Sequence, residues 1–389
     1  MPPHVVIVGG GPAGLEAARA YRETGGEGGV TLISADEFAP YNRPPLSKDF
    51  LRGESDESDL PLEEGGFYKS NEIDVLLDTR ATALRPHQHR LTLSDGTELE
   101  YHTCILATGA IPTPLPARGA QDPGVRYLRS RRDARTLRQA AASSRSSVVI
   151  GSGFIGCEAA ASLVRRGLVV TLVTMEELPQ IDRLGRGAGE RLRSWLQNEG
   201  VTLRLGVEVA EVQGNRLVHL SDGTTAEGDF ILVAGGVKPE AALAADGGLD
   251  MAQDRVTVDT HMRSSHPDVL AAGDVAFAYN TGAERHLAVE HWGEALTMGR
   301  VAGATAAGHQ TEWHEVPGFW STIGDRTLKY AAWGDGFDSD HLVDRGDGAF
   351  TIWYERDGTA VGVLTHEADD DYDLGKDLIG RHRPAPIKG

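Results

Sequence analysis

Short apolar runs alternate with helix-forming stretches along the first two thirds of the chain. Val5–Val8 is apolar and bounded by glycines, and the alanine-rich segment Pro12–Tyr21 follows it, which predicts a strand, a tight turn and a helix. Val30–Ile33 predicts the second strand of the same unit. The order of strand, glycine turn, helix and strand returns at Ser147–Val173. The pattern therefore predicts a duplicated βαβ unit.

Each unit continues into residues that alternate between apolar and polar. At 89–99 and 216–225, Ser-Asp-Gly-Thr stands between alternating apolar residues, which predicts two matching hairpins. Each half then closes on an apolar strand that ends in a glycine turn, at Cys104–Ala110 and Phe230–Gly236. From about residue 317 the chain is richer in aromatic and β-branched residues. We predict an α/β fold with two Rossmann-like dinucleotide-binding domains and a small C-terminal α+β domain.

Composition narrows the possible functions. Lys and Arg number 38 against 57 Asp and Glu, and the formal net charge of −19 argues against binding to nucleic acid. Cys104 and Cys157 are the only cysteines and form no CxxC pair, so we expect neither a disulfide framework nor a dithiol relay nor a metal site. The first eleven residues show neither a basic n-region nor a long apolar core, and no stretch of about 18 apolar residues follows, so we expect a cytoplasmic protein.

Two glycine-rich motifs stand at the predicted strand-to-helix turns. Gly9–Gly14 (GGGPAG) and Gly151–Gly156 (GSGFIG) both have the GxGxxG spacing in the context of a dinucleotide fingerprint. The first glycine permits the tight turn, the second lets the backbone approach a pyrophosphate, and the third lets the helix pack closely. Asp36 or Glu37 follows the first motif at the spacing of an acid that binds ribose hydroxyls. Two fingerprints predict two dinucleotides, FAD and a nicotinamide nucleotide.

Five segments taken together resemble a known family. They are VVIVGGGPAGLEAARAYRE at the start, PYNRPPLSKDFL at 40–51, CILATGA at 104–110, GSGFIGCEAA at 151–160 and VLAAGDVA at 269–276. In this order they resemble the FAD-dependent pyridine nucleotide-disulfide oxidoreductases, in particular the ferredoxin, rubredoxin and putidaredoxin reductases of oxygenase systems. This group is also similar to apoptosis-inducing factor. The resemblance covers roughly residues 4–320, and the C-terminal domain matches more loosely.

The resemblance implies two sets of cofactor ligands. The implied FAD ligands are Gly9, Gly11, Pro12, Ala13, Gly14, Asp36, Arg43, Lys48, Ala81, Ala107, Thr108, Gly109, Gly273, Asp274, His291 and Trp292. The implied nicotinamide-nucleotide ligands are Gly151, Gly153, Phe154, Ile155, Gly156, Glu158, Thr174, Glu176 and Gly236. Residue chemistry independently favours two of them, because the planar guanidinium of Arg43 suits a pyrophosphate and the carboxylate of Asp274 can accept from ribityl hydroxyls.

Three residues are implied to shape the surroundings of the flavin ring. Lys48 is implied to lie near flavin N5, Glu158 to be its partner beside the nicotinamide, and Trp320 to pack by both rings. Each also has an ordinary structural interpretation: Lys48 in a solvated surface pair, Glu158 as an acid in the first turn of a helix, and Trp320 in a core. Trp320 begins WSTIGD where the family more usually has WSDQY, so we expect changed surroundings.

The preference between nicotinamide nucleotides depends on the residues after the second strand of the second unit. The family usually places an acid directly after this strand, and this chain has Thr174 there. Glu176 follows two residues later and would repel a 2′-phosphate, and no arginine occurs until Arg183. We expect NADH rather than NADPH, and NADPH stays open as the alternative.

The electron acceptor is inferred from what the chain lacks. Where disulfide reductases of this superfamily carry their redox-active cysteines, the chain has Pro40–Arg43. We therefore expect electrons to pass to a ferredoxin or similar iron–sulfur protein that serves an oxygenase system. The alternatives are an NAD(P)H oxidase, a reductase of quinone or another small acceptor, and a redox-sensing module like apoptosis-inducing factor. The downstream enzyme, the flavin potential and the oligomeric state stay open.

Two charged segments have competing interpretations. Arg126–Arg145 holds seven arginines and one acid, which fits either a docking patch for an acidic iron–sulfur protein or a solvated helix face. Glu367–Asp373 (EADDDYD) is interpreted as a solvated loop rather than a metal site.

The expected domains divide the chain unevenly. Residues 1–112 and 240–315 form the FAD domain, 113–239 the nicotinamide domain, and 316–389 the C-terminal domain, which closes over the flavin. The FAD domain is discontinuous because the segment 269–276 must return to complete its site.

Overall fold

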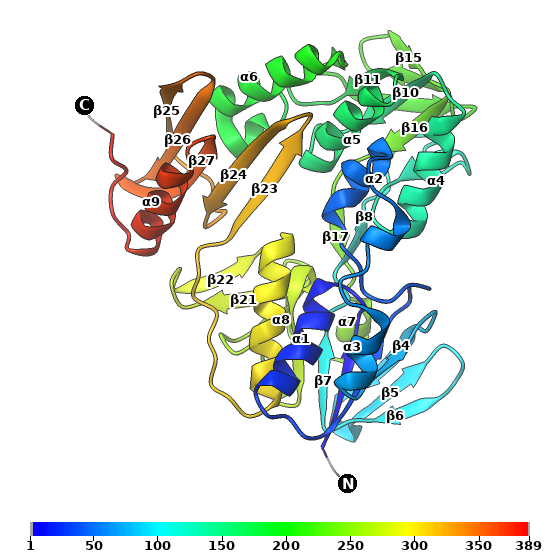
Figure 1. Cartoon of the computed structure of the whole chain (residues 1–389), viewed down its shortest axis with the longest axis vertical. Helices are drawn as coiled ribbons and strands as arrows, with labels where there is room; N and C mark the ends of the chain where they lie inside the picture. Colours follow the sequence, from blue (N-terminus) through cyan, green and yellow to red (C-terminus); the bar gives the residue numbers. More distant parts are fainter. Residues whose placement is uncertain (1–2, 388–389) are drawn as a thin grey trace.

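A computed structural model describes residues 3–387 of the chain. Figure 1 shows three groups of elements: one at the end that carries the N-terminus, a second at the opposite end, and a third beside them that carries the C-terminus. No helix in the described residues is long and apolar enough to cross a membrane.

The first apolar runs form a parallel sheet in the order β20-β7-β1-β2-β3. The central strand β1 (His4–Val8) is aliphatic and nearly all buried, as expected for a strand covered on both faces. Its neighbours are β2 (Gly29–Ile33) and β7 (Thr103–Leu106), and the sheet ends at β3 (Ile73–Leu76) and β20 (Val269–Ala271). Because β20 pairs with β7, the chain returns to this sheet after passing through the second unit.

Helices and two small sheets flank the first sheet, except that the helical elements at 44–52 pack against the second unit (Figure 1). The helix α1 (Pro12–Glu23) joins β1 to β2 and packs against α8 (Trp292–Ala306), as Figure 1 shows. The other helical elements are η1 (Pro44–Ser47), α2 (Asp49–Arg52), η2 (Glu57–Asp59), α3 (Gly65–Ser70), η3 (Pro86–Gln88), α7 (Ala242–Asp246) and η4 (Gly273–Val275). The other strands are β4 (Ala81–Arg85), β5 (Arg90–Leu93), β6 (Glu98–Glu100), β18 (Met251–Ala252), β19 (Arg255–Val258), β21 (Ala276–Asn280) and β22 (Arg285–Ala288).

A second parallel sheet repeats the plan in the order β12-β11-β10-β16-β9. Its helical elements are α4 (Arg131–Ala142), α5 (Phe154–Arg165) and α6 (Ile181–Glu199). Its strands are β9 (Val125–Tyr127), β10 (Ser146–Ile150), β11 (Val169–Val173), β12 (Thr202–Arg204) and β16 (Phe230–Val233). A three-stranded antiparallel sheet of β13 (Val209–Gln213), β14 (Leu217–Leu220) and β15 (Thr225–Glu227) lies beside it. The duplicated βαβ unit and both predicted hairpins are confirmed.

Two short strands and a terminal sheet complete the fold. β8 (Ala110–Pro112) and β17 (Val237–Pro239) pair where the chain leaves the first unit and returns to it. An antiparallel sheet in the order β23-β24-β27-β26-β25 then carries α9 (Asp369–Gly380) on it. Its strands are β23 (Gly318–Ile323), β24 (Arg326–Ala332), β25 (Ser339–Gly346), β26 (Ala349–Arg356) and β27 (Thr359–His366). The hairpin β23–β24 reaches toward α5 of the second unit, as Figure 1 shows.

Candidate functional site

A cleft of about 1030 Å³ lies between the two parallel sheets and the β23–β24 hairpin. It collects most residues that the sequence points to. The predicted residues that line it are Gly9, Gly11, Pro12, Ala13, Asp36, Arg43, Lys48, Ala81, Ala107, Thr108, Gly109, Gly153, Phe154, Ile155, Glu158, Gly236, Gly273, Asp274, His291, Trp292 and Trp320. Those outside the lining are Gly14, Gly151, Gly156, Thr174 and Glu176.

The first glycine loop leaves room for a phosphate group in the cleft. Gly9 has φ +129°, and a Cβ there would stand 2.0 Å from the carbonyl oxygen of Ala107. A Cβ on Gly14 would stand 2.0 Å from the carbonyl oxygen of Gly9, so the helix α1 begins against the strand end. At Gly11 nothing lies within 4 Å of the Cβ position. This loop can therefore receive a pyrophosphate at the N-terminus of α1.

A partly buried cation, Arg43, also lines the cleft and has no acid within ion-pair distance among residues 3–387. Burial lowers the pKa of the Arg43 guanidinium, and the nearby charge of Arg129 lowers it further. Within residues 3–387, Arg43 makes only a long hydrogen bond of 3.5 Å to the carbonyl oxygen of Arg129 and a contact with the ring of Tyr41. Arg129 itself pairs with Asp274 at 2.7 Å. A partly buried guanidinium held this way suits a bound anion such as a pyrophosphate.

Asp36 and Glu37 are separated by the structure. The Asp36 carboxylate lines the cleft and accepts the hydroxyl of Tyr41 at 2.8 Å. Glu37 instead pairs with Arg132 at 3.1 Å. Of the two acids, Asp36 is therefore placed to accept from a ribose.

The first turn of α8 closes one end of the cleft. His291 and Trp292 both line it, and burial lowers the pKa of His291 to about 3, with the charge of Arg183 adding to the effect. The His291 imidazole is therefore neutral at pH 7, and its Nδ1 is buried without a hydrogen-bond partner among the described residues. Phe319 packs between His291 and Phe154, with ring centroids 4.3 and 4.7 Å away. This turn can receive a ring with polar edges.

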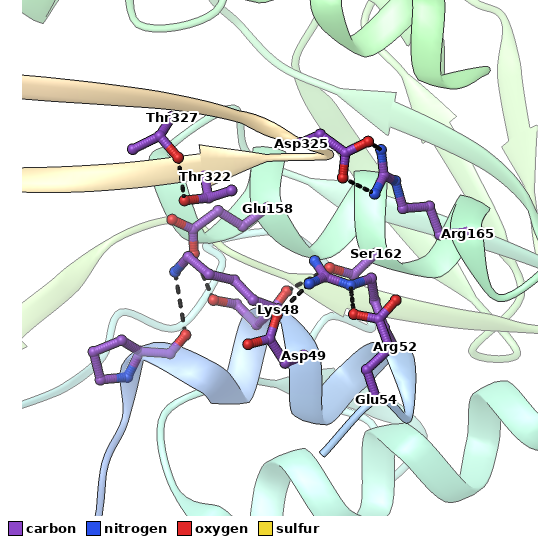
Figure 2. Close-up of polar contacts among 12 residues, drawn as sticks. Lys48, Asp49, Arg52, Glu54, Glu158, Ser162, Arg165, Thr322, Asp325 and Thr327 are labelled. Atoms are coloured by element: carbon purple, nitrogen blue, oxygen red, sulfur yellow. Dashed lines mark hydrogen bonds and ion pairs between the residues drawn. The ribbon is translucent and has the colours of Figure 1, made fainter. Parts of the chain in front are cut away.

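Lys48 and Glu158 meet inside the cleft, as Figure 2 shows. The Lys48 ammonium donates to Glu158 Oε2 at 2.7 Å and to the carbonyl oxygen of Pro44 at 3.1 Å. Glu158 is 5% exposed and also accepts the hydroxyl of Ser47 at 2.5 Å and the hydroxyl of Ser321 at 2.6 Å. The carboxylate, which stands on α5, thus binds donors from two other segments: η1 with the residue after it, and β23.

Trp320 stands on β23 at the mouth of the cleft, where it is 50% exposed. The WSTIGD segment forms the end of β23 and the turn into β24, and its Asp325 accepts two hydrogen bonds from Arg165 of α5, at 2.5 and 2.7 Å (Figure 2). Thr322 and Thr327 hydrogen-bond across the hairpin at 2.9 Å. Asp325 therefore ties the tip of the hairpin to the second unit. Phe319, the residue before Trp320, was not predicted from the sequence as a site residue.

The second glycine loop repeats the close packing of the first. A Cβ on Gly156 would stand 2.1 Å from the carbonyl oxygen of Gly151, so α5 begins directly against β10. Thr174 and Glu176 lie beside this loop, where both bond the hydroxyl of Ser152.

Neither cysteine takes part in the cleft. Cys104 and Cys157 are fully buried free thiols in β7 and α5. Burial raises the pKa of Cys104 to about 12 and raises that of Cys157 strongly. Both are therefore inert core thiols under ordinary conditions.

The arginine-rich helix α4 is largely neutralised within the chain. Arg131 and Arg135 both pair with Glu57 at 2.6 Å, and Arg138 pairs with Asp56 at 3.3 Å. Arg131 also lies over the ring of Phe38. These contacts hold α4 against the segment 37–59, so they do not support a free docking patch at these arginines.

The acidic segment at 367–373 starts α9 rather than forming a loop. Asp369 pairs with Lys329 at 2.8 Å and Asp371 with Arg345 at 2.6 Å. Within residues 3–387 no group of His, Cys, Asp or Glu is arranged to hold a metal ion.

Comparison with known proteins identifies the family. The sequence profile of the family described as pyridine nucleotide-disulphide oxidoreductase matches residues 3–307. The chain belongs to this family. A rubredoxin-NAD(+) reductase of Pseudomonas putida is 35% identical over 84% of this chain and 85% of its own length. Human apoptosis-inducing factor 3 is 29% identical over 94% of this chain and 61% of its own length.

The fold is also that of a reductase of solved structure. A covalent putidaredoxin reductase–putidaredoxin complex superposes with a TM-score of 0.92 at 29% identity, covering 98% of this chain and 94% of that one. The protein is thus an oxidoreductase, and the cofactors of its family are FAD and NAD(P)H. The cleft fits FAD, because among the described residues it offers an open glycine loop, a partly buried guanidinium at Arg43 with no ion-pair partner and an imidazole nitrogen at His291 with no hydrogen-bond partner.

Proposed function

We propose that this protein oxidises a reduced nicotinamide nucleotide, NADH in preference to NADPH, and delivers single electrons to a ferredoxin-type or rubredoxin-type protein of an oxygenase system. The observation that carries the proposal is the buried Lys48–Glu158 pair, which lies in one cleft with both glycine loops while no cysteine lines that cleft. Bound FAD supplies the change from hydride chemistry to single-electron chemistry. Without a thiol acceptor in the cleft, the electrons leave the protein for an external partner.

The chain's own residues supply binding and charge. Arg43, Arg129 and the N-terminus of α1 bind the pyrophosphate, and Asp36 accepts from the ribose. Lys48 holds a fixed positive charge in the cleft, which stabilises negative charge that develops on a ring beside it.

Glu158 fixes the position of that ammonium, and Trp320 shields the mouth of the cleft from water while staying accessible to a partner. The other residues predicted to bind FAD or the nicotinamide nucleotide are proposed as ligands as a set. We also keep the expected domain limits of 1–112 with 240–315, 113–239 and 316–389 as a proposal. A cytoplasmic location is proposed with them, and the two free thiols are compatible with a reducing compartment.

The test is a two-step anaerobic experiment on the purified yellow protein. In the first step stopped-flow absorbance follows flavin reduction by NADH and separately by NADPH. In the second step the reduced protein is mixed with cytochrome c, with and without an oxidised ferredoxin or rubredoxin. Fast reduction followed by cytochrome reduction that requires the iron protein is the expected result.

The alternatives make different predictions in the same experiment. Rapid turnover with oxygen or quinone and no gain from an iron protein would replace the proposal with a small-acceptor reductase. Slow reduction into a stable long-wavelength species, indifferent to the iron protein, would replace it with a redox sensor like apoptosis-inducing factor.

A further inference from the structure

A buried acid, Glu294, stands in the first turn of α8, directly after the residues that close one end of the cleft. It is 5% exposed, and its partners among residues 3–387 are two N–H groups rather than a cation. Burial raises the pKa of this carboxyl, and the nearby charge of Glu315 adds to the effect, while the charge of Lys376 on α9 acts against it. A buried carboxylate without a counter-charge lowers stability, so its presence here calls for another role.

The two oxygens of Glu294 hold the segment that leads into β23. The indole N–H of Trp313 donates to Oε2 at 3.0 Å, and the backbone N–H of Gly318 donates to Oε1 at 3.4 Å. Trp313 is fully buried, and its backbone is hydrogen-bonded to the first unit. Gly318 is the first residue of β23, and a Cβ there would overlap the hydroxyl of Tyr372 on α9. The carboxylate therefore joins the turn of α8 that closes the cleft to the start of β23.

Three successive residues of β23 reach the cleft from this starting point. Phe319 packs on the ring of His291, with ring centroids 4.3 Å apart. Trp320 lines the mouth of the cleft, and the hydroxyl of Ser321 donates to Glu158 at 2.6 Å. Because these residues follow one another on a single strand, a shift of the first residue of that strand would move all three side chains relative to the cleft.

The hairpin β23–β24 is held at both ends. At its tip Asp325 pairs with Arg165 of α5, which belongs to the second unit. At its start Glu294 binds Gly318 from α8, which packs on the first unit. The strand β23 thus bridges the two units, and the contact of Glu294 determines where this bridge meets the first of them.

We infer that Glu294 is a positioning residue that places β23, and with it Trp320, over the cleft. Its carboxylate does not line the cleft, so it acts through the backbone of Gly318 rather than by touching a cofactor. The inference rests on the proposed function, because that proposal gives Trp320 its role at the mouth of the cleft. Glu294→Gln keeps the shape of the side chain but leaves one acceptor oxygen for two N–H groups. The shorter bond, to Trp313, should persist, and the contact with Gly318 should be lost.

The test observes Trp320 directly in the flavin-loaded full chain labelled with 5-fluorotryptophan. The chain has six tryptophans, and Trp320→Phe assigns the fluorine resonance of Trp320. In Glu294→Gln this resonance should shift or broaden, and stopped-flow absorbance should show that the limiting rate of flavin reduction by NADH falls about tenfold. The NADH concentration that gives half of this rate should change less than about threefold, because Glu294 touches no ligand. The thermal unfolding midpoint should stay within about 3 °C, since the variant loses one hydrogen bond and one buried charge.

Two further variants serve as controls. Glu312→Gln removes an exposed acid from the same linker and should leave the Trp320 resonance and the reduction rate unchanged. Trp313→Phe removes the N–H on the other oxygen of Glu294 and leaves the contact with Gly318 in place. This variant should lower the unfolding midpoint more than Glu294→Gln does, because it also alters a buried side chain, and should slow flavin reduction less than about threefold.

Two outcomes would overturn the inference. One is a Glu294→Gln protein whose Trp320 resonance and limiting rate equal those of the wild type. The other is an equal displacement of the Trp320 resonance in Glu294→Gln and Trp313→Phe, which would show that burial of the linker, and not the contact with Gly318, places the strand. The two proposals fail separately. A wild type that reduces no iron protein, with Trp320 displaced in Glu294→Gln, refutes the proposed function alone, and the reverse pair of results refutes this inference alone.

Discussion

Removing the ammonium of Lys48 should leave a buried carboxylate without its counter-charge. The two side chains are 13% and 5% exposed, and their charged atoms are 2.7 Å apart. Loss of one partner of such a buried pair costs about 3–5 kcal/mol of folding free energy. In Lys48→Met the carboxylate of Glu158 keeps the hydroxyls of Ser47 and Ser321, so we expect the lower end, about 3 kcal/mol. In Glu158→Gln the cation keeps only neutral acceptors, the carbonyl oxygen of Pro44 and the new amide oxygen, so the loss should be at least as large.

The double variant Lys48→Met/Glu158→Gln separates the pair from its surroundings. It buries no unpaired charge, so its unfolding free energy should return to within about 1 kcal/mol of the wild type, with a coupling of about 5 kcal/mol. Urea unfolding followed by tryptophan fluorescence measures all four proteins. Lys329→Met is the matched control, because its pair with Asp369 is 39% and 67% exposed and is worth less than about 1 kcal/mol. Equal midpoints for Lys48→Met and the wild type would show that the pair is hydrated and would refute this reasoning.

Three further predictions concern the glycine loop, acid stability and the thiols. Gly9→Ala should lose FAD, because its Cβ would stand 2.0 Å from a backbone carbonyl oxygen; Gly96→Ala, also at positive φ but with open space around it, should keep a full flavin absorbance. Hydrogen bonds from two arginines lower the pKa of Glu57 from 4.5 to about 2, so the stability it adds is present above pH 4.5 and is lost between pH 4.5 and 2. Glu57→Gln should therefore flatten the fall of the urea midpoint over that window, and an identical fall would contradict the assignment. Cys104 and Cys157 should resist a thiol reagent at pH 8 until urea is added. Labelling of either thiol without urea would show that its helix or strand opens in the folded protein.

The repeated strand, glycine turn and helix could be predicted because each step depends on local rules. The residues of Gly9–Gly14 need their particular φ values and close contacts wherever the chain folds this way, so the sequence alone identifies the loop. Arg129 could not be found in this manner. It lies among seven arginines, and only the folded chain shows that it turns toward Asp274 while others turn toward Glu57.

Contacts between distant segments explain why other residues of the site could not be predicted from the sequence. Ser47 and Ser321 bond Glu158 from positions more than 100 residues away in sequence, at separations of 111 and 163 residues. Nothing in the pattern around either serine marks it, since a buried hydroxyl gains its role from the acceptor it meets. The nearest signal was their place beside Lys48 and Trp320, which the family resemblance had already singled out.

The return of β20 to the first sheet sets the order in which the protein can mature on the ribosome. The strands of the second sheet lie within residues 125–233, so all of them leave the ribosome together as one continuous stretch. The first sheet begins earlier yet keeps one side of β7 open until residues 269–271 have been made, and Asp274 arrives only after that. Because domains fold as units during synthesis, the first sheet, although its translation begins earlier, is completed after the second. A nascent chain stopped before residue 269 would therefore carry a finished second sheet beside an exposed strand edge.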